Sequence, residues 1–404
     1  MLNLEKIRRD FPLFEKETNG KPLVYFDNAC MSLKPLSVIK AITEYYYDYP
    51  ACGGRSGHKL ADTVTKKVAS AREKIAKFIN AKHAHEIIFT RNTTEGINLI
   101  AHSLKLNSGD IILTTDKEHN SNLIPWQVLA KKTGIIHKIV ESKPDNTFDL
   151  KKFKSAMSSK IKLVAMVHTS NLDGVSIPAK EIIKIAHSYG ALVLLDAAQS
   201  APHKKIDVID LDVDFLAFSG HKILGPTGTG VLYGKKKLLE NLEPFMTGGE
   251  TVEFSTYLDH KFLPSPEKFE AGLQDYAGII GLGEAVEYLK NVGYDNIKEQ
   301  EYKLNKYLTE AILKIPKAKI IGPEDPNLRN GIVSFYIEGI DSHQIAILLD
   351  EGANVMIRAG QHCVHSWFNA HNIITSARVS LNFYNTMEEA EIFVNSLNKI
   401  MKIL

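Results

Sequence analysis

Apolar and polar positions alternate along the first part of the chain in a way that predicts strands separated by helices. Continuous apolar runs predict strands at "DIILTT", "GIIHKIV", "IKLVAMVHTS", "ALVLLDAAQS" and "VDFLAFSG". Between them, apolar residues recur at helical spacing over residues 122–132, 149–155 and 179–189. Strands that are apolar on both faces and separated by helices predict a mostly parallel sheet, which holds ligands beyond the carboxyl ends of its strands.

Two earlier segments extend this pattern. "KPLVYFDNACMSLKP" predicts a strand that ends in a polar loop, after which Pro35 begins an amphipathic helix toward Tyr47. "EIIFTRNTTEGINLIAHSL" predicts a strand followed by a helix whose first turn holds Thr93, Thr94 and Glu95. Several predicted strands therefore end in polar residues of the kinds that bind ligands.

The character of the chain changes at Gly278, where longer helical runs begin and then alternate with short strands up to a closing helix. This predicts a second lobe of the α+β type, with a boundary between Phe262 and Gly281. No Gly/Ser-rich or Pro-rich linker marks that boundary, so we expect the two lobes to pack closely.

Composition narrows the class of protein. The 404 residues are 44% hydrophobic and 24% charged, which is typical of a soluble globular protein. The formal charge is +2 and no block of five like charges occurs, so no nucleic-acid surface is expected. The three cysteines, Cys30, Cys52 and Cys363, argue against a disulfide framework and favour the cytoplasm. No targeting signal or membrane-spanning stretch is expected.

The segment "DFLAFSGHKILGPTGTGVLYG" carries the most specific chemical pattern. A P-loop is excluded because the lysine precedes the glycines and Val231 follows Gly230. A dinucleotide fingerprint is excluded because "GPTGTG" has the wrong spacing and leads into a strand. Lys222 at a strand end, flanked by Ser219 and His221, suits covalent attachment of an aldehyde cofactor whose phosphate the neighbours hold. Pyridoxal 5'-phosphate has both groups.

Pyridoxal 5'-phosphate also needs partners for its ring nitrogen, its phenolate oxygen, the face of its ring and its phosphate, and the chain offers a candidate for each. Asp196, at the end of an apolar strand, suits the ring nitrogen, and the Gln199 amide suits the phenolate oxygen of the ring. His119 lies in a polar loop after a strand and suits stacking on the ring. Thr93 and Thr94 open a helix and suit the phosphate. Taken singly, each residue reads as a cap, a loop residue or a solvated charge, but their order on successive strand ends favours one common site.

Cys363, in "RAGQHCVHSW", has three interpretations. Taken alone, an unpaired cysteine is most often a small buried apolar residue. A metal ligand is not expected, because Cys363 and His365 form only a C-x-H pair and no C-x-x-C accompanies them. The third interpretation, a nucleophile, depends on the site around it.

The segments "TTEGIN", "EHNSNLIPWQ", "HTSNLDG", "DAAQSAPH", "FSGHKILGPTGTGVLYG", "FEAG", "GIIGLGEAVEYL", "RAGQHC" and "ARVSLNFYNT" resemble the cysteine desulfurases of the class V aminotransferase family. The resemblance extends over nearly the whole chain. The arginine-to-cysteine spacing in "RAGQHC" resembles the type II branch, which includes the SUF-type desulfurases and the selenocysteine lyases.

The resemblance implies an α/β fold, the pyridoxal phosphate-dependent transferase fold type I. It has a large domain with a mostly parallel mixed sheet flanked by helices, and a smaller α+β C-terminal domain. We expect the large domain over residues 20–270 and the small domain over residues 1–19 and 271–404. The resemblance also implies a homodimer that converts L-cysteine to L-alanine and passes sulfur to an acceptor protein, for iron–sulfur cluster assembly or thiolation.

The resemblance also implies residue roles. Lys222 would bind the cofactor and move the α-proton, and Cys363 would receive the sulfur as a persulfide. The substrate carboxylate would bind Arg378 with help from Asn171, and Arg358 would lie near the nucleophile loop. Ser219, His221 and Thr94 would hold the phosphate. Thiol chemistry adds that a nearby imidazolium, His362 or His365, would lower the pKa of the Cys363 thiol, or that the proton balance of the substrate would do so; the sequence does not decide between them. Trp367 and the loop around it would face a partner.

The chain departs from the family pattern at three positions. Gly54, beside Arg55, replaces a histidine, and Leu273 replaces a threonine whose hydroxyl reaches the partner subunit's phosphate in the family. Cys30 lies in a loop that is usually rich in alanine and serine, and Cys52 lies in another loop that approaches the family site. Alternative functions are therefore a selenocysteine lyase, another class V aminotransferase or lyase, or a sulfur-relay protein of low turnover.

Overall fold

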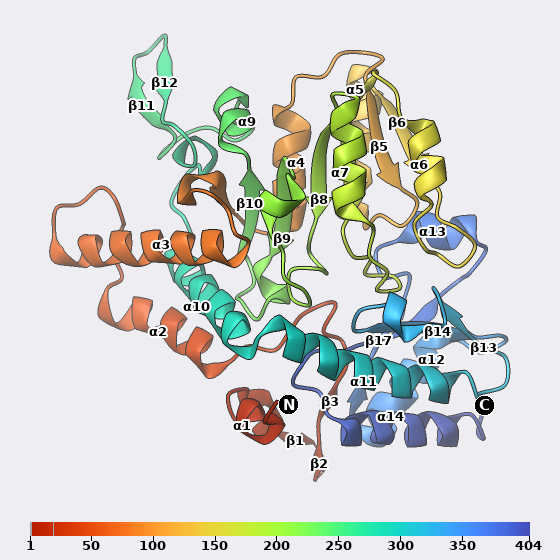
Figure 1. Cartoon of the computed structure of the whole chain (residues 1–404). Coiled ribbons are helices and arrows are strands. Elements are labelled where there is room, and N and C mark those ends of the chain that lie inside the picture. The colour runs from red at the N-terminus through yellow and green to blue at the C-terminus, as the bar shows by residue number, and fades with distance from the viewer. Residues whose placement is uncertain (1, 19) are drawn as a thin grey trace.

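The computed structural model describes residues 2–18 and 20–404 and has an α/β architecture (Figure 1). Its largest sheet has seven strands in the order β4-β10-β9-β8-β7-β5-β6, of which β10 alone runs antiparallel to its neighbours. This confirms the predicted mostly parallel mixed sheet. The strands are β4 (Ile87–Thr90), β5 (Ile111–Thr115), β6 (Ile136–Val140), β7 (Ile161–Val167), β8 (Leu192–Asp196), β9 (Phe215–Ser219) and β10 (Gly230–Gly234).

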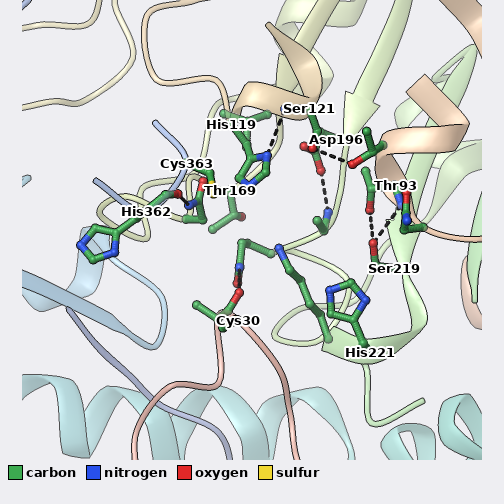
Figure 2. Close-up of a pocket in the computed structure, with 18 of the residues that line it drawn as sticks. Cys30, Thr93, His119, Ser121, Thr169, Asp196, Ser219, His221, His362 and Cys363 are labelled. Atoms are coloured by element: carbon green, nitrogen blue, oxygen red, sulfur yellow. Dashed lines mark hydrogen bonds between the residues drawn. The ribbon is translucent and has the colours of Figure 1, made fainter. Parts of the chain in front are cut away.

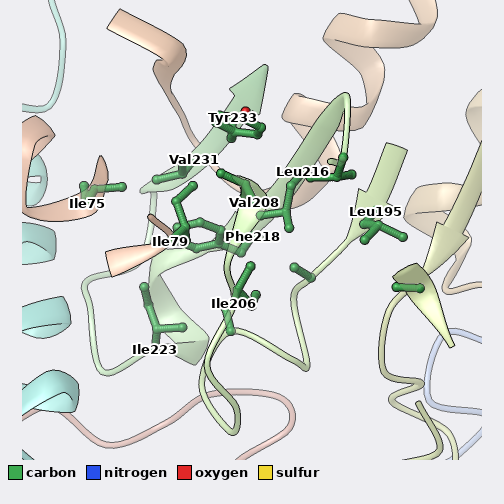
Figure 3. Close-up of a cluster of buried hydrophobic side chains, with 14 of the residues drawn as sticks. Ile75, Ile79, Leu195, Ile206, Val208, Leu216, Phe218, Ile223, Val231 and Tyr233 are labelled. Atoms are coloured by element: carbon green, nitrogen blue, oxygen red, sulfur yellow. The ribbon is translucent and has the colours of Figure 1, made fainter. Parts of the chain in front are cut away.

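Two apolar clusters cover the two faces of this sheet, except at the edge strand β6, which is mostly exposed. In β9, Leu216 and Phe218 join the larger cluster (Figure 3), whereas Phe215 and Ala217 join a second cluster on the other face. A fully buried Leu or Phe side chain stabilises a fold by about 1.5–3 kcal/mol. The first face is covered by α3 (Lys59–Phe78), α7 (Ala179–Ser188) and α10 (Tyr276–Val292), and the second by α4 (Thr93–Ser103) and α5 (Ile124–Thr133).

The C-terminal part forms a second, antiparallel sheet of four strands in the order β13-β14-β17-β16. These strands are β13 (Ala318–Ile321), β14 (Ile332–Ile337), β16 (Arg358–Gly360) and β17 (Ser376–Ser380). Three helices contribute to the apolar cluster of this sheet, namely α11 (Tyr294–Ile312), α12 (Ser342–Ala353) and α14 (Met387–Ile400). The N-terminal strand β3 (Val24–Tyr25) pairs in parallel with β15 (Val355–Met356), which ties the start of the chain to this lobe.

The domain bounds 20–270, 1–19 and 271–404 stay a prediction, and Met1 and Asn19 lie outside the described residues. The predicted helix after Pro35 is confirmed as α2 (Leu36–Asp48). The elements that were not predicted include α3, the hairpin of β11 (Val252–Ser255) and β12 (His260–Phe262), and α13 (His365–Ala370). Smaller elements are α1 (Leu4–Arg8), β1 (Glu17–Thr18), β2 (Lys21–Pro22), α6 (Leu150–Ala156), α8 (Val208–Leu211) and α9 (Lys236–Asn241).

None of the helices in the described part of the chain combines the length and the apolar character that a membrane crossing needs.

A buried histidine at the end of β7 makes the stability of the fold depend on pH. His168 is 6% exposed, and burial, followed by the charge of Lys204, lowers its pKa from 6.5 to about 3. Because the unfolded chain binds this proton near pH 6.5 and the folded chain only near pH 3, unfolding takes up a proton between these values. We expect His168 to remove about 1.4 kcal/mol of stability for each pH unit below 6.5.

Urea unfolding of the wild type and of His168→Gln at pH 7.0 and pH 5.5 measures this effect. The variant cannot take up this proton, so its free energy of unfolding should fall less than that of the wild type. Equal losses in the two proteins would show that His168 is not the group that titrates.

Candidate active site

A cavity of about 250 Å³ opens beyond the carboxyl ends of the parallel strands (Figure 2). All twelve site residues predicted from the sequence line it: Thr93, Thr94, His119, Asn171, Asp196, Gln199, Ser219, His221, Lys222, Arg358, Cys363 and Arg378. The sequence interpretation missed others, among them Ala29, Asn92, Ser121 and Thr169. Asn92, Ser121 and Thr169 lie one or two positions from predicted residues in the sequence, and Ala29 lies in the N-terminal loop.

Four neighbouring strands of the large sheet bring the first group together. His119 follows β5, Asn171 follows β7, Asp196 ends β8, and Ser219 ends β9 just before Lys222. Because neighbouring parallel strands end at the same edge of a sheet, residues up to about a hundred positions apart converge there. Arg358 and Arg378 come from paired positions on β16 and β17 of the second sheet and complete the cavity from the other lobe.

Gly230, the first residue of β10, lets the backbone approach helix α4. A Cβ atom at Gly230 would lie 2.6 Å from the Cα of Asn92. Asn92 is the N-cap of α4, and its side chain accepts a hydrogen bond from Glu95 N at 3.0 Å. Gly230 therefore allows the N-terminus of α4 to lie against the start of β10.

We expect Gly230→Ala to lower the free energy of unfolding by about 1–3 kcal/mol, because the added methyl group meets backbone that cannot rotate away. Thermal unfolding measures this loss. Gly352→Ala is the matched control, since a Cβ atom at Gly352 meets nothing within 4 Å. An unchanged midpoint in Gly230→Ala would contradict the proposed contact.

The N-terminus of α4 presents hydroxyl and backbone donors to the cavity. The Thr93 backbone N–H donates to Ser219 Oγ at 2.9 Å, and the Thr93 and Ser219 hydroxyls lie 2.6 Å apart. The Thr94 hydroxyl lies 2.7 Å from that of Ser121. Unpaired N–H groups at the start of a helix, together with the helix dipole, favour an anion such as a phosphate.

Lys222 and Asp196 are both desolvated in this cavity. Burial lowers the pKa of the Lys222 amine, while the charge of Asp196 acts in the opposite direction. Burial raises the pKa of Asp196, against a hydrogen bond that Ala198 N donates to Oδ1 at 2.9 Å. A lower lysine pKa increases the neutral fraction of the amine, which is the form that acts as a nucleophile or a base.

His119 is held as a neutral ring. Burial and then the charge of Lys222 lower its pKa to about 3. Its Nδ1 accepts a hydrogen bond from Ser121 N at 3.1 Å, so the proton of the neutral ring lies on Nε2. A neutral imidazole over the cavity suits stacking on a flat ligand.

Two buried groups leave hydrogen-bonding capacity unused. Arg378 is 2% exposed; it donates to Asn171 O at 3.1 Å and to Asp27 Oδ1 at 3.3 Å, and its Nε has no partner. Asn171 donates to His362 O at 2.7 Å, but its Oδ1 has no partner. Buried polar atoms without a partner are costly, so these two mark a place for a polar ligand group.

The predicted thiolate-tuning role is wrong for His362. Burial and the charges of Arg378 and Arg358 hold the pKa of His362 well below its usual range, so its ring is neutral. The ring hydrogen-bonds to Ser376 Oγ at 2.8 Å and packs inside the loop. His365 lies instead at the start of α13, where its Nδ1 lies 2.8 Å from the Asn120 amide.

Trp367 does not face a partner, which corrects a further prediction. It is 4% exposed, packs in a cluster with Leu172, Val364 and Phe368, and stacks on His371 with ring centroids 4.1 Å apart. The tryptophan therefore supports the nucleophile loop from within.

Gln199 lines the cavity, and its amide has a protein partner that was not predicted. Its Nε2 donates to the Ala29 carbonyl at 2.7 Å, and its Oε1 is buried without a partner, while the expected contact with a ring oxygen stays a prediction. Cys30 lines the cavity, whereas Cys52 is exposed and is not among the lining residues.

The structure also describes the other two positions at which the chain departs from the family pattern, Gly54 and Leu273. Gly54 has φ of +79°, a conformation that a histidine would adopt only with strain. Leu273 is 65% exposed, and its expected place near a partner subunit stays a prediction. Among residues 2–18 and 20–404, no group of three or more His, Cys, Asp or Glu side chains is arranged to hold a metal ion.

The family model described as aminotransferase class-V matches residues 24–393. The chain belongs to the class V aminotransferase family. Family relatives named probable cysteine desulfurase include one from Synechocystis sp., 43% identical over 98% of this chain and 95% of the relative. A second, from Halalkalibacterium halodurans, is 42% identical over 98% of both chains.

Solved structures of the same family agree with the fold described here. The apo structure of a cysteine desulfurase from Thermococcus onnurineus NA1 has a TM-score of 0.95 at 38% identity, covering 100% of this chain and 99% of its own. The cysteine desulfurase CsdA from Escherichia coli has a TM-score of 0.92 at 31% identity, covering 100% of both chains. The predicted fold and family are thus confirmed, while the individual residue roles stay predictions.

Proposed function

We propose that this protein is a pyridoxal 5'-phosphate-dependent cysteine desulfurase, which converts L-cysteine to L-alanine and keeps the sulfur as a persulfide on Cys363. The observation that carries the proposal is the convergence of Lys222, Asp196, His119 and Cys363 on one cavity. Relatives of about 40% identity named as probable cysteine desulfurases support it.

The residues of the cavity fit this cofactor. The start of α4, with Thr93, Thr94 and Ser219, offers donors for the phosphate, and His221 lies beside them in the lining. The Asp196 carboxylate suits the protonated ring nitrogen, and the neutral His119 ring suits the flat face. When bound through Lys222, the cofactor withdraws electrons from the α-carbon of the substrate.

The other residues act on the substrate. Arg378 Nε and Asn171 Oδ1, both buried without a partner, suit the carboxylate and the amine of an amino acid. The Lys222 amine takes the α-proton, and burial favours its neutral form. The Cys363 thiolate attacks the substrate sulfur, so the carbon–sulfur bond breaks and a sulfur–sulfur bond forms. Protonation of the remaining carbon skeleton gives alanine.

The loop geometry supports Cys363 as the nucleophile. His362 and Cys363 have φ of +49° and +60°, an uncommon backbone conformation outside glycine. Asn171 holds the His362 carbonyl, and Asn120 N donates to the Cys363 carbonyl at 2.8 Å. These contacts fix a strained turn that presents the cysteine at the cavity (Figure 2).

The proposal also covers the branch of the family, the cellular compartment, the oligomeric state and the fate of the sulfur. The spacing in "RAGQHC" supports the type II branch, and three unpaired cysteines support a reducing compartment, the cytoplasm. We place the protein there as a homodimer that passes sulfur to an acceptor protein for iron–sulfur cluster assembly or thiolation.

The purified protein, loaded with pyridoxal phosphate and supplied with L-cysteine and a thiol reductant, tests the activity. We expect alanine and sulfide in equal amounts. A protein that turns over only L-selenocysteine would be a selenocysteine lyase. A protein that makes a keto acid instead of alanine would be a carbon–sulfur lyase if it also releases sulfide, and an aminotransferase if it does not. Either result would overturn the proposal.

A further inference from the structure

We propose that Cys30 is a second sulfur-carrying residue of this active site, which takes the persulfide sulfur from Cys363 within the same subunit. This inference rests on the proposed desulfurase function. It starts from the presence of two thiols, 333 positions apart in the sequence, in the lining of one cavity.

The two thiols reach the cavity on loops from opposite ends of the sequence. Figure 2 shows Cys30 on the N-terminal loop and Cys363 on the C-terminal loop. Both line the same cavity as Lys222. Both side chains are partly exposed, so a sulfur atom on either can be reached from the cavity.

Cys30 is held in a fixed loop. Ala29 N donates to Ser380 Oγ at 2.9 Å, Ala29 O accepts from Gln199 at 2.7 Å, and Cys30 N donates to Asp27 O at 3.1 Å. These bonds tie the loop to β17, to the end of β8 and to its own first residue. The sulfur of Cys30 therefore has a defined position in the cavity.

Arg358 gives this sulfur an anion-binding partner. Its Nη1 donates to Cys30 Sγ at 2.9 Å, and a guanidinium group can only donate hydrogen bonds. The same group is suited to bind the negatively charged outer sulfur of a persulfide. A second cation in the lining, Arg378, is buried and keeps an unpartnered Nε, so once alanine has left, the cavity offers a further donor to an anionic group.

The transfer is a thiol exchange in which atoms and electrons balance. The Cys30 thiolate attacks the outer sulfur of the Cys363 persulfide, the sulfur–sulfur bond at Cys363 breaks, and a new one forms at Cys30. Cys363 leaves as a thiolate, and the proton given up by Cys30 neutralises it. No oxidant or reductant is consumed, and Cys363 becomes free to attack a second L-cysteine.

A chase without reductant or acceptor tests this relay. The holoenzyme receives about three equivalents of L-cysteine per subunit, is alkylated at short times, and is analysed by peptide mass spectrometry with alanine measured in parallel. Each alanine that forms leaves one sulfur atom on an enzyme thiol. The wild type has two such thiols in the cavity, so we expect about two alanines per subunit, and about one in Cys30→Ser and Cys30→Ala. Sulfur should appear on Cys363 first and on Cys30 second.

Two further variants make the result specific. Cys52→Ser is the matched control and should behave as the wild type, because Cys52 lies outside the cavity lining. In Cys363→Ser, Cys30 should stay free of sulfur, since its sulfur comes from Cys363. The relay is overturned if wild-type Cys30 stays unmodified while Cys363 is loaded, if Cys30 is loaded without Cys363, or if Cys52 is loaded as fast as Cys30. Absence of alanine and of sulfur on Cys363 would instead refute the proposed desulfurase activity.

Discussion

Replacing Cys363 with serine should lower sulfide release from L-cysteine by at least about 10³-fold, the scale of loss seen when an enzyme loses its nucleophile. The serine hydroxyl is not ionised at neutral pH and cannot accept sulfur. The cavity and the positions that bind the cofactor are otherwise retained, so the cofactor absorbance should stay. Sulfide and alanine assays under saturating L-cysteine measure the loss.

Cys52→Ser is the control for this substitution, since it removes an exposed thiol that does not line the cavity. It should keep the wild-type rate. A Cys363→Ser enzyme that still releases sulfide at a rate within tenfold of the wild type would mean that the carbon–sulfur bond is broken by a lyase reaction without an enzyme thiol.

Replacing Lys222 with alanine should abolish covalent attachment of pyridoxal phosphate and lower alanine formation by about 10²–10⁴-fold or more, since it also removes the base that takes the α-proton. Borohydride reduction followed by mass analysis measures the attachment. The wild type should gain the reduced cofactor on the peptide that contains Lys222, and the variant should gain none.

Lys204→Met provides a matched control. Lys204 is also largely desolvated, with burial lowering its pKa to about 8, but it donates to Ser176 Oγ at 2.6 Å and does not line the cavity. This variant should keep the cofactor. Attachment of the cofactor to the Lys222→Ala protein at another lysine would contradict the assignment of Lys222.

Much of the cofactor part of the site could be predicted because its residues follow apolar strands. The runs that end at Asp196 and Ser219 are apolar on both faces, so the strands and their place in a mostly parallel sheet follow from the pattern, whereas the order of the strands in the sheet was not predicted. The helix start at Thr93 was visible from its capping residues. These local signals predicted the residues that line the part of the cavity expected to hold the cofactor.

The rest depends on contacts between distant residues. The hydrogen bond from Arg358 to Cys30 joins positions 328 apart, and no local pattern indicates it. Trp367 and His362 lie in a polar segment, yet tertiary packing buries both, which explains why one was expected at a partner surface and the other as an imidazolium.

There are also physical reasons why helix α3 and the hairpin of β11 and β12 were not predicted from the sequence. Helix α3 buries mostly small residues, such as Ala61 and Ala71, among many charged ones, so its apolar stripe is faint. The hairpin of β11 and β12 is almost wholly exposed, and its strands have only four and three residues, too few for a pattern of alternation to stand out. Neither element contributes a residue to the cavity lining.

The most direct test of this account is the mass of the Cys363 peptide during a single turnover of the holoenzyme with one equivalent of L-cysteine. We predict that this peptide first gains the mass of one sulfur atom, at the rate at which alanine appears. Alanine that forms while the Cys363 peptide keeps its unmodified mass at every time point would contradict the account.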